Sequence, residues 1–252
     1  MARVFDGTCR LCEEEWKGQG ITSHVKRCLA EHANLAAVHH GLLLGIRADG
    51  LGGRYWMYLM VRPEASLAKL DAFLRQTWIP DCDQASVFEI DESQYLSTVS
   101  PDDSPEGDIQ GLEIDIGAVL RPRMELSYLF DPMHPTELEI TVYDPYPCPE
   151  ALVPEDGDPD VVLVARNDEP TIECSTCEQT ATAVCPVCAA EPEAAEPEPE
   201  ELDEAEERDD EAAEEHLGPF ACDDCRDKHD HGVDLLPIVN SPRMGICTFE
   251  TG

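Results

Sequence analysis

The sequence predicts an α+β fold in which a small antiparallel sheet with few helices is flanked by two cysteine-rich modules. Two observations lead to this prediction. The middle of the 252-residue chain holds short apolar or alternating segments, with one clear helical pattern among them. Pairs of cysteines with two residues between them stand near both ends of the chain, a spacing that is typical of metal ligands.

Segments in the middle of the chain predict several strands and a helix. Residues 54–63, RYWMYLMVRP, are mostly apolar and aromatic, which predicts a buried strand. Residues 66–78 carry apolar side chains at helical spacing after Ser66, a residue type suited to capping a helix. Residues 85–90 predict a short strand, and residues 160–167 predict a last one.

A β-hairpin is predicted in the second half of this domain. Residues 124–131, MELSYLFD, and residues 136–144, TELEITVYD, alternate in polarity. The segment PMHP between them supplies prolines that favour a turn. Several strands with few helices indicate an antiparallel sheet.

The first metal-ligand pattern lies in residues 9–28, CRLCEEEWKGQGITSHVKRC. A cysteine pair is followed by a histidine and a cysteine four residues apart, which share one face of a helix. Trp16 and Ile21 supply a small apolar core. The segment resembles the two-Cys-two-His zinc finger, with Cys for the last His and a spacer one residue short, and His32 one turn further on is an alternative ligand. The predicted zinc ligands are Cys9, Cys12, His24 and Cys28.

We interpret this finger as structural or protein-binding rather than as a reader of DNA. A DNA-reading finger needs basic side chains that neutralise phosphates. Here acidic residues follow the first cysteine pair, and only Lys26 and Arg27 are basic in the first helical turns. We expect the helix to continue through residues 29–46 with a buried apolar stripe, so that His39 and His40 are ordinary helix residues.

The C-terminal region offers eight metal ligands, which is the number that two tetrahedral zinc sites require. Because two cysteine pairs that close on one zinc usually need a longer spacer than seven residues, we expect interleaved pairing. The first and third cysteine pairs would share one zinc, and the second pair would share another with two histidines. This arrangement resembles the cross-braced B-box modules. The predicted ligands, in chain order, are Cys174, Cys177, Cys185, Cys188, Cys222, Cys225, His229 and His231.

The three predicted Zn²⁺ ions are expected to be structural. Ligation by four protein side chains leaves no coordination position for water or substrate. Cys247 is a spare cysteine in this region, and it is an alternative to either histidine as a ligand.

An acidic insert, residues 189–217, separates the second and third C-terminal cysteine pairs. Its single charge sign and its lack of aromatic residues and apolar periodicity predict a disordered segment. Loop closure costs only about 0.6 kcal/mol per doubling of length, so a zinc module can hold such an insert. The expected domains are therefore a zinc finger with its following helix at 1–49, an α+β domain at 50–170, and a zinc-binding module at 171–252.

The chain is strongly acidic, with 54 acidic and 17 basic residues and a formal net charge of -37. One interpretation of this charge is that the protein binds a basic partner. The other is adaptation to molar salt, in which a Debye length of about 3 Å screens the repulsion between surface carboxylates. Acidic residues remain in large excess outside the insert, and lysine is rare, which favours a halophilic, archaeal cytoplasm.

The sequence predicts a cytoplasmic protein that does not cross a membrane. No run reaches the roughly 18 apolar residues of a transmembrane helix, and the N-terminus lacks the pattern of a signal peptide. In such a compartment, 12 cysteines favour metal binding over disulfide bonds.

The order of the central segments resembles the Ri-plasmid ORF-three-like family (the pRiA-four-b type). The resemblance covers about residues 50–145 and departs from the family where Pro132 and Met133 replace the usual hairpin glycine. It implies a compact α+β fold of unknown biochemical role, sometimes carried on mobile elements. The flanking zinc modules are similar to the arrangement in archaeal members. The residues that carry the resemblance are Tyr55, Leu67, Leu70, Trp78, Tyr128, Phe130, Asp131, Glu137 and Leu138.

No catalytic motif accompanies these modules. The chain contains neither G-x-S-x-G nor H-E-x-x-H, and paired carboxylates are expected by chance in so acidic a sequence. We therefore expect a non-enzymatic, zinc-binding interaction or adaptor protein with a protein partner and no small-molecule substrate. The alternative is a nucleic-acid-associated regulator, of transcription or of mobile elements, that uses the N-terminal finger.

Overall fold

The computed structural model describes residues 3–17, 20–32, 36–79, 83–98, 109–132, 135–155, 158–190 and 218–247. The chain forms two compact units. The larger unit comprises Met1–Pro170 and Val239–Cys247, and the smaller unit comprises Thr171–Ile238 and Thr248–Gly252. No helix within the described ranges is long and apolar enough to span a membrane.

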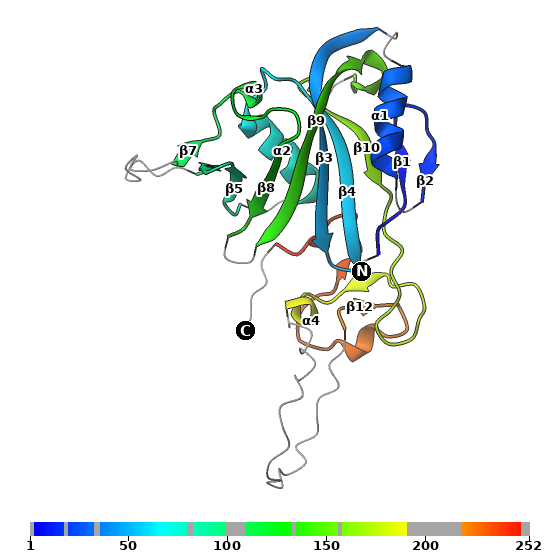
Figure 1. Cartoon of the computed structure of the whole chain (residues 1–252). Coiled ribbons are helices and arrows are strands. Elements are labelled where there is room, and N and C mark those ends of the chain that lie inside the picture. Colours follow the sequence, from blue (N-terminus) through cyan, green and yellow to red (C-terminus); the bar gives the residue numbers. More distant parts are fainter. Residues whose placement is uncertain are drawn as a thin grey trace, which may run out of the picture. The chain divides into compact units, whose positions relative to one another are not determined.

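The larger unit is built on one ten-stranded sheet, as far as the described residues show, in the order β2-β1-β10-β4-β3-β9-β8-β5-β6-β7 (Figure 1). All neighbours are antiparallel except β6 and β7. The sheet is therefore larger than the small one that was predicted, and the unit is mostly β. The strands are β1 (Gly7–Cys9), β2 (Glu15–Trp16), β3 (Ala37–Gly50), β4 (Gly53–Val61), β5 (Ser86–Ile90), β6 (Ser93–Leu96), β7 (Ile109–Gly111), β8 (Glu125–Phe130), β9 (Thr136–Pro149) and β10 (Val161–Asn167).

Few helices accompany this sheet. In the described part of this unit they are α1 (Ile21–Glu31), α2 (Leu67–Trp78), the short α3 (Ile116–Val119) and the 3-10 turn η1 (Glu150–Leu152). The finger strands β1 and β2 belong to the same sheet as β10 and β4. The finger therefore lies within the larger unit, in contrast to the expected boundary near residue 49.

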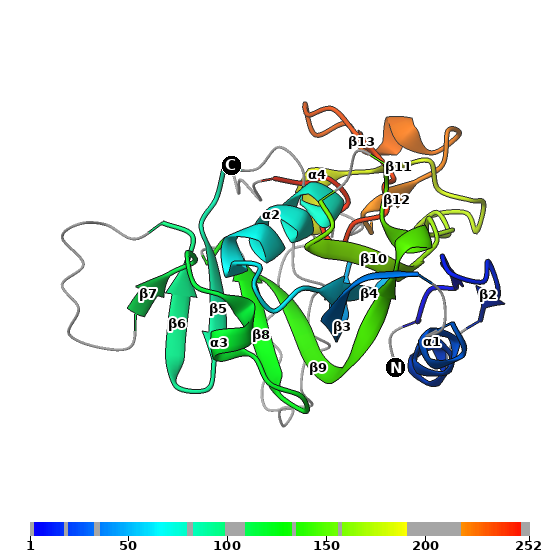
Figure 2. The ribbon, with the colours of Figure 1, turned by 90° about the horizontal axis from the view of Figure 1, so that it is seen from above.

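Strand β4 is buried on both faces, because nearly all of its side chains are apolar. On one face, Trp56 and Tyr58 belong to an apolar cluster that includes Val25 of α1. On the other face, the Tyr55 ring lies 6.5 Å from the ring of Trp78 in α2. Figure 2 shows α1 and α2 on opposite sides of β3, β4 and β10. The predicted buried strand is thus the centre of the core.

The predicted continuation of the finger helix through residues 29–46 is wrong. Helix α1 ends at Glu31, and β3 begins at Ala37. Two glycines explain the difference: they disfavour a helix, and each sits where a side chain would collide with neighbouring strands. A Cβ on Gly41 would lie 2.8 Å from the Val61 carbonyl oxygen, and one on Gly45 would lie 2.8 Å from the Tyr143 ring. His39 and His40 are therefore strand residues.

The other central elements confirm the sequence patterns. Strands β8 and β9 pair as the predicted hairpin, β5 and β10 occupy the expected segments, and Ser66 is the N-cap of α2. The Ser66 side chain makes no capping hydrogen bond, so the cap is positional only.

The segment Val239–Cys247 is anchored in the larger unit by a buried arginine. The Arg243 guanidinium lies 3.3 Å from the Asp131 carboxylate and donates to the carbonyl oxygens of Ile246 and Cys247 at 2.9 and 2.7 Å. Both charged side chains are almost completely buried. Cys247 is disulfide-bonded, so it is not a spare metal ligand, and the expectation that the cysteines avoid disulfides fails at this residue.

The smaller unit holds a three-stranded sheet in the order β12-β11-β13. The elements in its described residues are β11 (Ala183–Val184), α4 (Pro186–Ala190), β12 (Phe220–Ala221), the 3-10 turn η2 (Arg226–Lys228) and β13 (Leu236–Pro237). Residues 191–217 of the predicted acidic insert lie outside the described residues. Ala189 and Ala190, which were assigned to the insert, belong to α4.

Candidate metal centres

Among the residues that the structure describes, three groups of cysteine and histidine side chains converge. In each group, four potential ligand atoms lie within 4.8 Å of one another. The finger cluster is Cys9, Cys12, His24 and Cys28. The four-cysteine cluster is Cys174, Cys177, Cys222 and Cys225, and the mixed cluster is Cys185, Cys188, His229 and His231. All twelve residues singled out in the sequence are therefore brought together.

The finger cluster is assembled by a tight turn and one helix face. Cys9 ends β1, and the turn after it closes through hydrogen bonds from Glu13 N to Cys9 O at 2.8 Å and from Cys9 N to Glu14 O at 3.1 Å. Glu13 adopts a left-handed backbone conformation with φ 58°. This geometry returns the chain toward α1, where His24 and Cys28 are one helical turn apart.

His24 is oriented for coordination through one particular ring nitrogen. Its Nε2 lies 3.4 Å from Cys12 Sγ, while Nδ1 faces the Glu14 carboxylate at 3.5 Å. The Trp16 ring packs 4.9 Å from the imidazole, centroid to centroid. A carboxylate on the second nitrogen is the usual support of a metal-ligating histidine. Glu14, which the sequence analysis considered only as unfavourable for DNA, faces this nitrogen, although Nδ1 makes no hydrogen bond among the described residues.

His32 is not part of the finger cluster. Its Nδ1 donates to the Cys28 carbonyl oxygen at 2.8 Å and lies 3.7 Å from Cys28 Sγ. This hydrogen bond follows the last turn of α1 and occupies the nitrogen nearest the sulfur. The geometry therefore does not favour His32 as a replacement for Cys28.

The two clusters of the smaller unit interleave along the chain. The first and third cysteine pairs form the four-cysteine cluster, and the second pair meets the two histidines. The strand pairs β11–β12 and β11–β13 hold this arrangement together, and Cys185 N donates to Pro219 O at 2.8 Å. The geometric grouping is the cross-braced one that the short spacer predicts. That these groups bind metal stays a prediction.

Two thiols of the four-cysteine cluster have pKa values that are shifted in opposite directions. Burial raises the pKa of Cys174, but backbone N–H groups, first that of Thr176 at 3.5 Å from the sulfur, lower it overall to about 6. A hydrogen bond to the Cys177 sulfur at 3.5 Å, together with burial, raises the pKa of Cys225 to about 12. A divalent cation among the sulfurs would stabilise every thiolate at once.

The mixed cluster uses different nitrogens from its two histidines. Cys188 Sγ lies 3.5 Å from His229 Nδ1 and 3.2 Å from His231 Nε2. His229 is 3% exposed, and burial lowers the pKa of its imidazole, which favours the neutral form that metals bind. Cys185 and Cys188 flank the start of α4, so both sulfurs come from one rigid turn.

These distances fit zinc. In a tetrahedral site with bonds of about 2.3 Å to sulfur and 2.0 Å to nitrogen, ligand atoms lie about 3.5 to 3.8 Å apart. The contacts described above range from 3.2 Å in the mixed cluster to 3.9 Å between Cys9 Sγ and Cys28 Sγ. Sets of two, three or four thiolates, completed to four ligands by imidazoles where needed, are the donor types that Zn²⁺ prefers among common biological cations.

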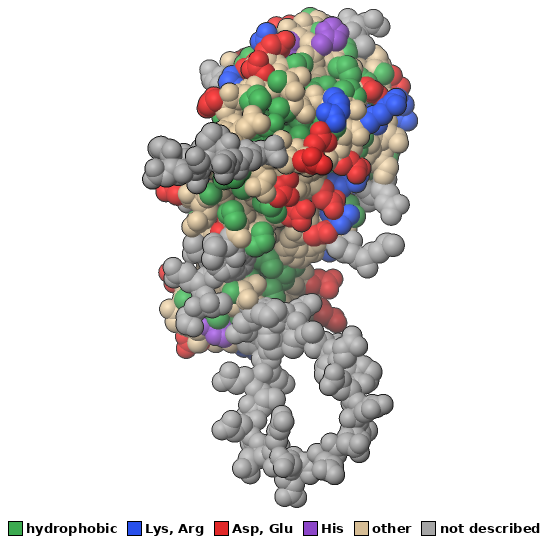
Figure 3. Space-filling model, turned by 60° about the vertical axis from the view of Figure 1, so that its left-hand side comes forward, with side chains coloured by type: hydrophobic (Ala, Val, Ile, Leu, Met, Phe, Trp, Pro, Cys, Tyr) green, Lys and Arg blue, Asp and Glu red, His purple; other side chains and the backbone are tan. Residues whose placement is uncertain are grey.

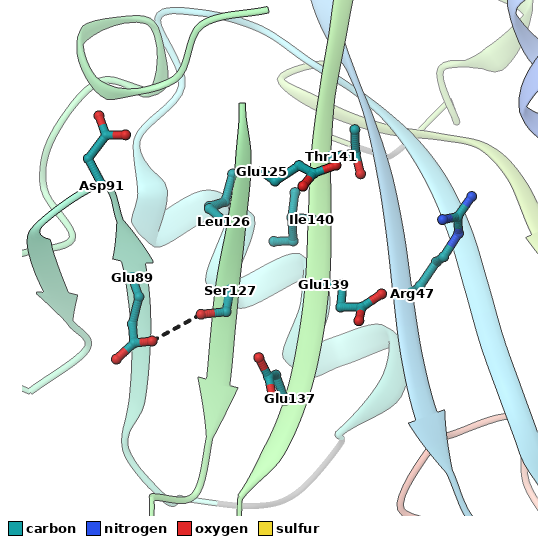
Figure 4. A pocket seen from close by; sticks show the side chains of 10 residues that line it. All are labelled: Arg47, Glu89, Asp91, Glu125, Leu126, Ser127, Glu137, Glu139, Ile140 and Thr141. Carbon is teal, nitrogen blue, oxygen red and sulfur yellow. Dashed lines mark hydrogen bonds between the residues drawn. The ribbon is translucent and has the colours of Figure 1, made fainter. Parts of the chain in front are cut away.

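An acid-lined hollow of about 530 Å³ lies over the sheet of the larger unit. Glu89, Ser127, Glu139 and Arg47 are successive cross-strand partners in β5, β8, β9 and β3. Figure 4 shows the carboxylates spread along this hollow, with one hydrogen bond, from Ser127 to Glu89, at 3.1 Å. Such a surface is expected in a chain with 54 acidic residues, and we assign no ligand to it.

No protein-family model matches the sequence, and a search of curated proteins also finds no match. Among solved structures, a protein of unknown function, MM3350 from Methanosarcina mazei Go1, matches with a TM-score of 0.38 and 11% sequence identity. The match covers 44% of this chain and 63% of that one, so it spans less than two thirds of MM3350. At this level the likeness is distant and supports no transfer of function. The resemblance of residues 50–145 to the Ri-plasmid ORF-three-like family stays a prediction.

Proposed function

We propose that the protein binds three structural Zn²⁺ ions and acts as a non-enzymatic interaction protein. The observation that carries the proposal is the presence of three separate clusters, each of which offers four protein ligand atoms within 4.8 Å. Coincidence does not account for twelve metal-ligating side chains that sort into three complete tetrads. The proposed ligands are the members of the finger, four-cysteine and mixed clusters.

The donor sets support a structural role. A catalytic zinc keeps one position for water or substrate and takes three protein ligands, whereas a structural zinc takes four. Each cluster supplies four. In the smaller unit, whose described sheet consists of two-residue strands, the metal would contribute stability that so small an apolar core does not supply.

A protein partner is favoured over nucleic acid by the surroundings of the finger helix. Its apolar side is buried against the sheet, and Lys26 lies over the Tyr143 ring at 3.8 Å, so its charge is engaged within the larger unit. Arg27 lies 3.9 Å from Glu31 on the exposed side of α1. Few basic groups of α1 are left to neutralise phosphates, as a DNA-reading helix must.

The surface chemistry supports a halophilic cytoplasm. Figure 3 shows acidic side chains spread over one face, with fewer basic groups among them. A net charge of -37 is tolerated when salt screens repulsion, and a partner bound at molar salt must rely on apolar or specific polar contacts rather than on long-range attraction.

X-ray absorption at the zinc edge of the full-length protein tests the structural role. Three closed sites contain nine sulfurs and three imidazole nitrogens, so the expected first shell has three sulfurs for each nitrogen. A first shell with more oxygen or nitrogen than this ratio, as an open catalytic site gives, would contradict the proposal. A parallel titration with duplex DNA in molar salt should show no saturable binding, and tight binding there would favour the regulator instead.

A further inference from the structure

A second kind of site lies on the larger unit, over the strands β1 and β10 where they pair. A pocket of about 300 Å³ is lined there by Thr8, Arg10, Leu163, Arg166, Asn167, Asp168 and Asn240. This volume is at the lower end of the range for small-molecule sites. None of these residues belongs to a metal cluster.

The local fold explains how two separated residues of β10 come to line one pocket. Side chains normally alternate between the faces of a strand, but the pairing of β10 with β4 shifts between Leu163 and Ala165. The shift places Leu163 and Arg166 on the same side. Thr8 stands directly opposite Arg166 in the β1–β10 ladder, and Arg10 follows β1.

Arg166 is a half-buried cation without a carboxylate partner in the described part of the chain. Its Nη2 donates to the Asn240 carbonyl oxygen at 2.7 Å, and its buried Nε has no hydrogen-bond partner among the described residues. Burial lowers the pKa of this guanidinium, and no opposing charge offsets the effect. Leaving such a group unpaired is costly, particularly in a chain so rich in acids.

Two other arginines with little exposure, within the described ranges, are paired with carboxylates. Arg243 faces Asp131 at 3.3 Å, and Arg75 donates to Asp71 at 2.9 Å. The difference at Arg166 indicates that its counter-charge comes from outside the chain. Asp168 also lines the pocket, but its carboxylate accepts a hydrogen bond from the Thr8 hydroxyl at 3.0 Å.

We propose that this pocket binds a small molecule through one oxyanion group, a carboxylate or a phosphate, held by Arg166 and Arg10. Guanidinium groups match the planar or forked oxygen pattern of such anions. Arg166 forms the half-buried anchor, and Arg10 supplies a second, exposed positive charge. Leu163 contributes an apolar wall, and Asp168 weakens the binding of any anion by its own charge.

Titration of the isotope-labelled full-length protein with inorganic phosphate and, separately, with sodium acetate tests the proposal. Ionic strength is held constant with chloride, and the amide signals of Thr8 and Asn240 report binding. Saturable shifts with either probe are expected, and the tighter probe identifies the kind of oxyanion. If neither probe shifts these signals beyond the chloride control, the proposal is wrong.

Variants separate a binding role from a folding role. Arg166→Gln should weaken binding at least tenfold. Arg10→Gln, which changes an exposed residue, should weaken it about two- to fivefold, and Asp168→Asn should strengthen it by a similar factor. Arg27→Gln on the exposed side of α1 is the matched control and should have no effect. Unchanged binding in Arg166→Gln would overturn the proposal, and the opposite signs expected for Arg10→Gln and Asp168→Asn cannot arise from a common folding defect.

Discussion

Two aspartate–arginine pairs of the larger unit differ mainly in burial. Asp131 pairs with Arg243 at 3.3 Å, and their side chains are 3% and 2% exposed. Asp91 pairs with Arg121 at 3.0 Å, and their side chains are 59% and 67% exposed. Both aspartates adopt a positive φ, 55° and 53°, a conformation that asparagine also tolerates. The chain thus offers a matched comparison of a buried and an exposed ion pair.

Asp131→Asn should lower the free energy of unfolding by about 3 to 5 kcal/mol, because it leaves the Arg243 charge buried without a counter-charge. Asp91→Asn should cost no more than about 1 kcal/mol, since water and salt already screen that pair. Denaturant titrations of both variants at the same salt concentration make the measurement. Equal losses in the two variants would show that burial does not govern the strength of these pairs.

Residue chemistry was the level best predicted from sequence. Spacing alone identified the twelve cysteine and histidine side chains that converge in three clusters, because a knuckle and one helical turn fix ligand geometry locally. The pairing of Arg243 with Asp131, and the approach of Glu14 to His24, depend on folded contacts. No local sequence pattern indicates such contacts.

At the level of secondary-structure elements, the main error of the sequence prediction was the helix expected where β3 lies. Its LLL run bounded by glycines is compatible with a helix or a strand, since a short apolar run has no distinctive period. Pairing with both β4 and β9 decides in favour of the strand. The isolated patterns of β4, β8 and α2 were predicted correctly because each spans a full strand or helix with its own apolar signal.

Zinc-ligand substitutions in the smaller unit should act on single sites. Cys185→Ser should remove one zinc from the full-length protein and lower the stability of the smaller unit, because three ligands hold a structural zinc poorly. Cys148→Ser is the control: Cys148 is fully buried in β9, burial raises the pKa of its thiol to about 11, and it belongs to no cluster. The control should keep its full zinc content. Retention of all zinc in Cys185→Ser would remove that residue from the ligand set.

The acidic segment between α4 and β12 should be dispensable for zinc binding. The chain on either side is held close, since Cys185 N donates to Pro219 O at 2.8 Å and α4 ends at Ala190. Because Cys185 next to the start of α4 is hydrogen-bonded to Pro219, a linker from Ala190 must run back along α4, a length of roughly 8 Å. Four linker residues reach about 13 Å, which is enough. Replacing residues 191–217 with such a Gly-Ser linker should keep every zinc and raise stability by roughly 1 to 2 kcal/mol through the shorter loop. Loss of a zinc would mean that the insert supplies a ligand.

At the scale of the whole molecule, the three clusters are distributed over both units. The finger cluster lies in the larger unit, where β1, α1 and the sheet already share an apolar core. The other two lie in the smaller unit, whose sheet has strands of only two residues. Metal removal should therefore unfold the smaller unit while much of the ten-stranded sheet persists. Circular dichroism before and after chelation measures this, and complete loss of β signal would contradict it.

The extent of the sheet was the hardest feature to foresee. Strand order β1-β10-β4-β3-β9 joins segments from both ends of the larger unit, and only tertiary contacts specify it. The sequence predicted an antiparallel sheet correctly, but it gave no sign that the finger strands would extend that sheet.

Native mass spectrometry of the full-length protein, purified without added metal or chelator, tests the central claim most directly. The account predicts a mass increase corresponding to three Zn²⁺ ions, one for each cluster. A protein that carries fewer than three zinc ions, or a different metal in their place, would contradict it.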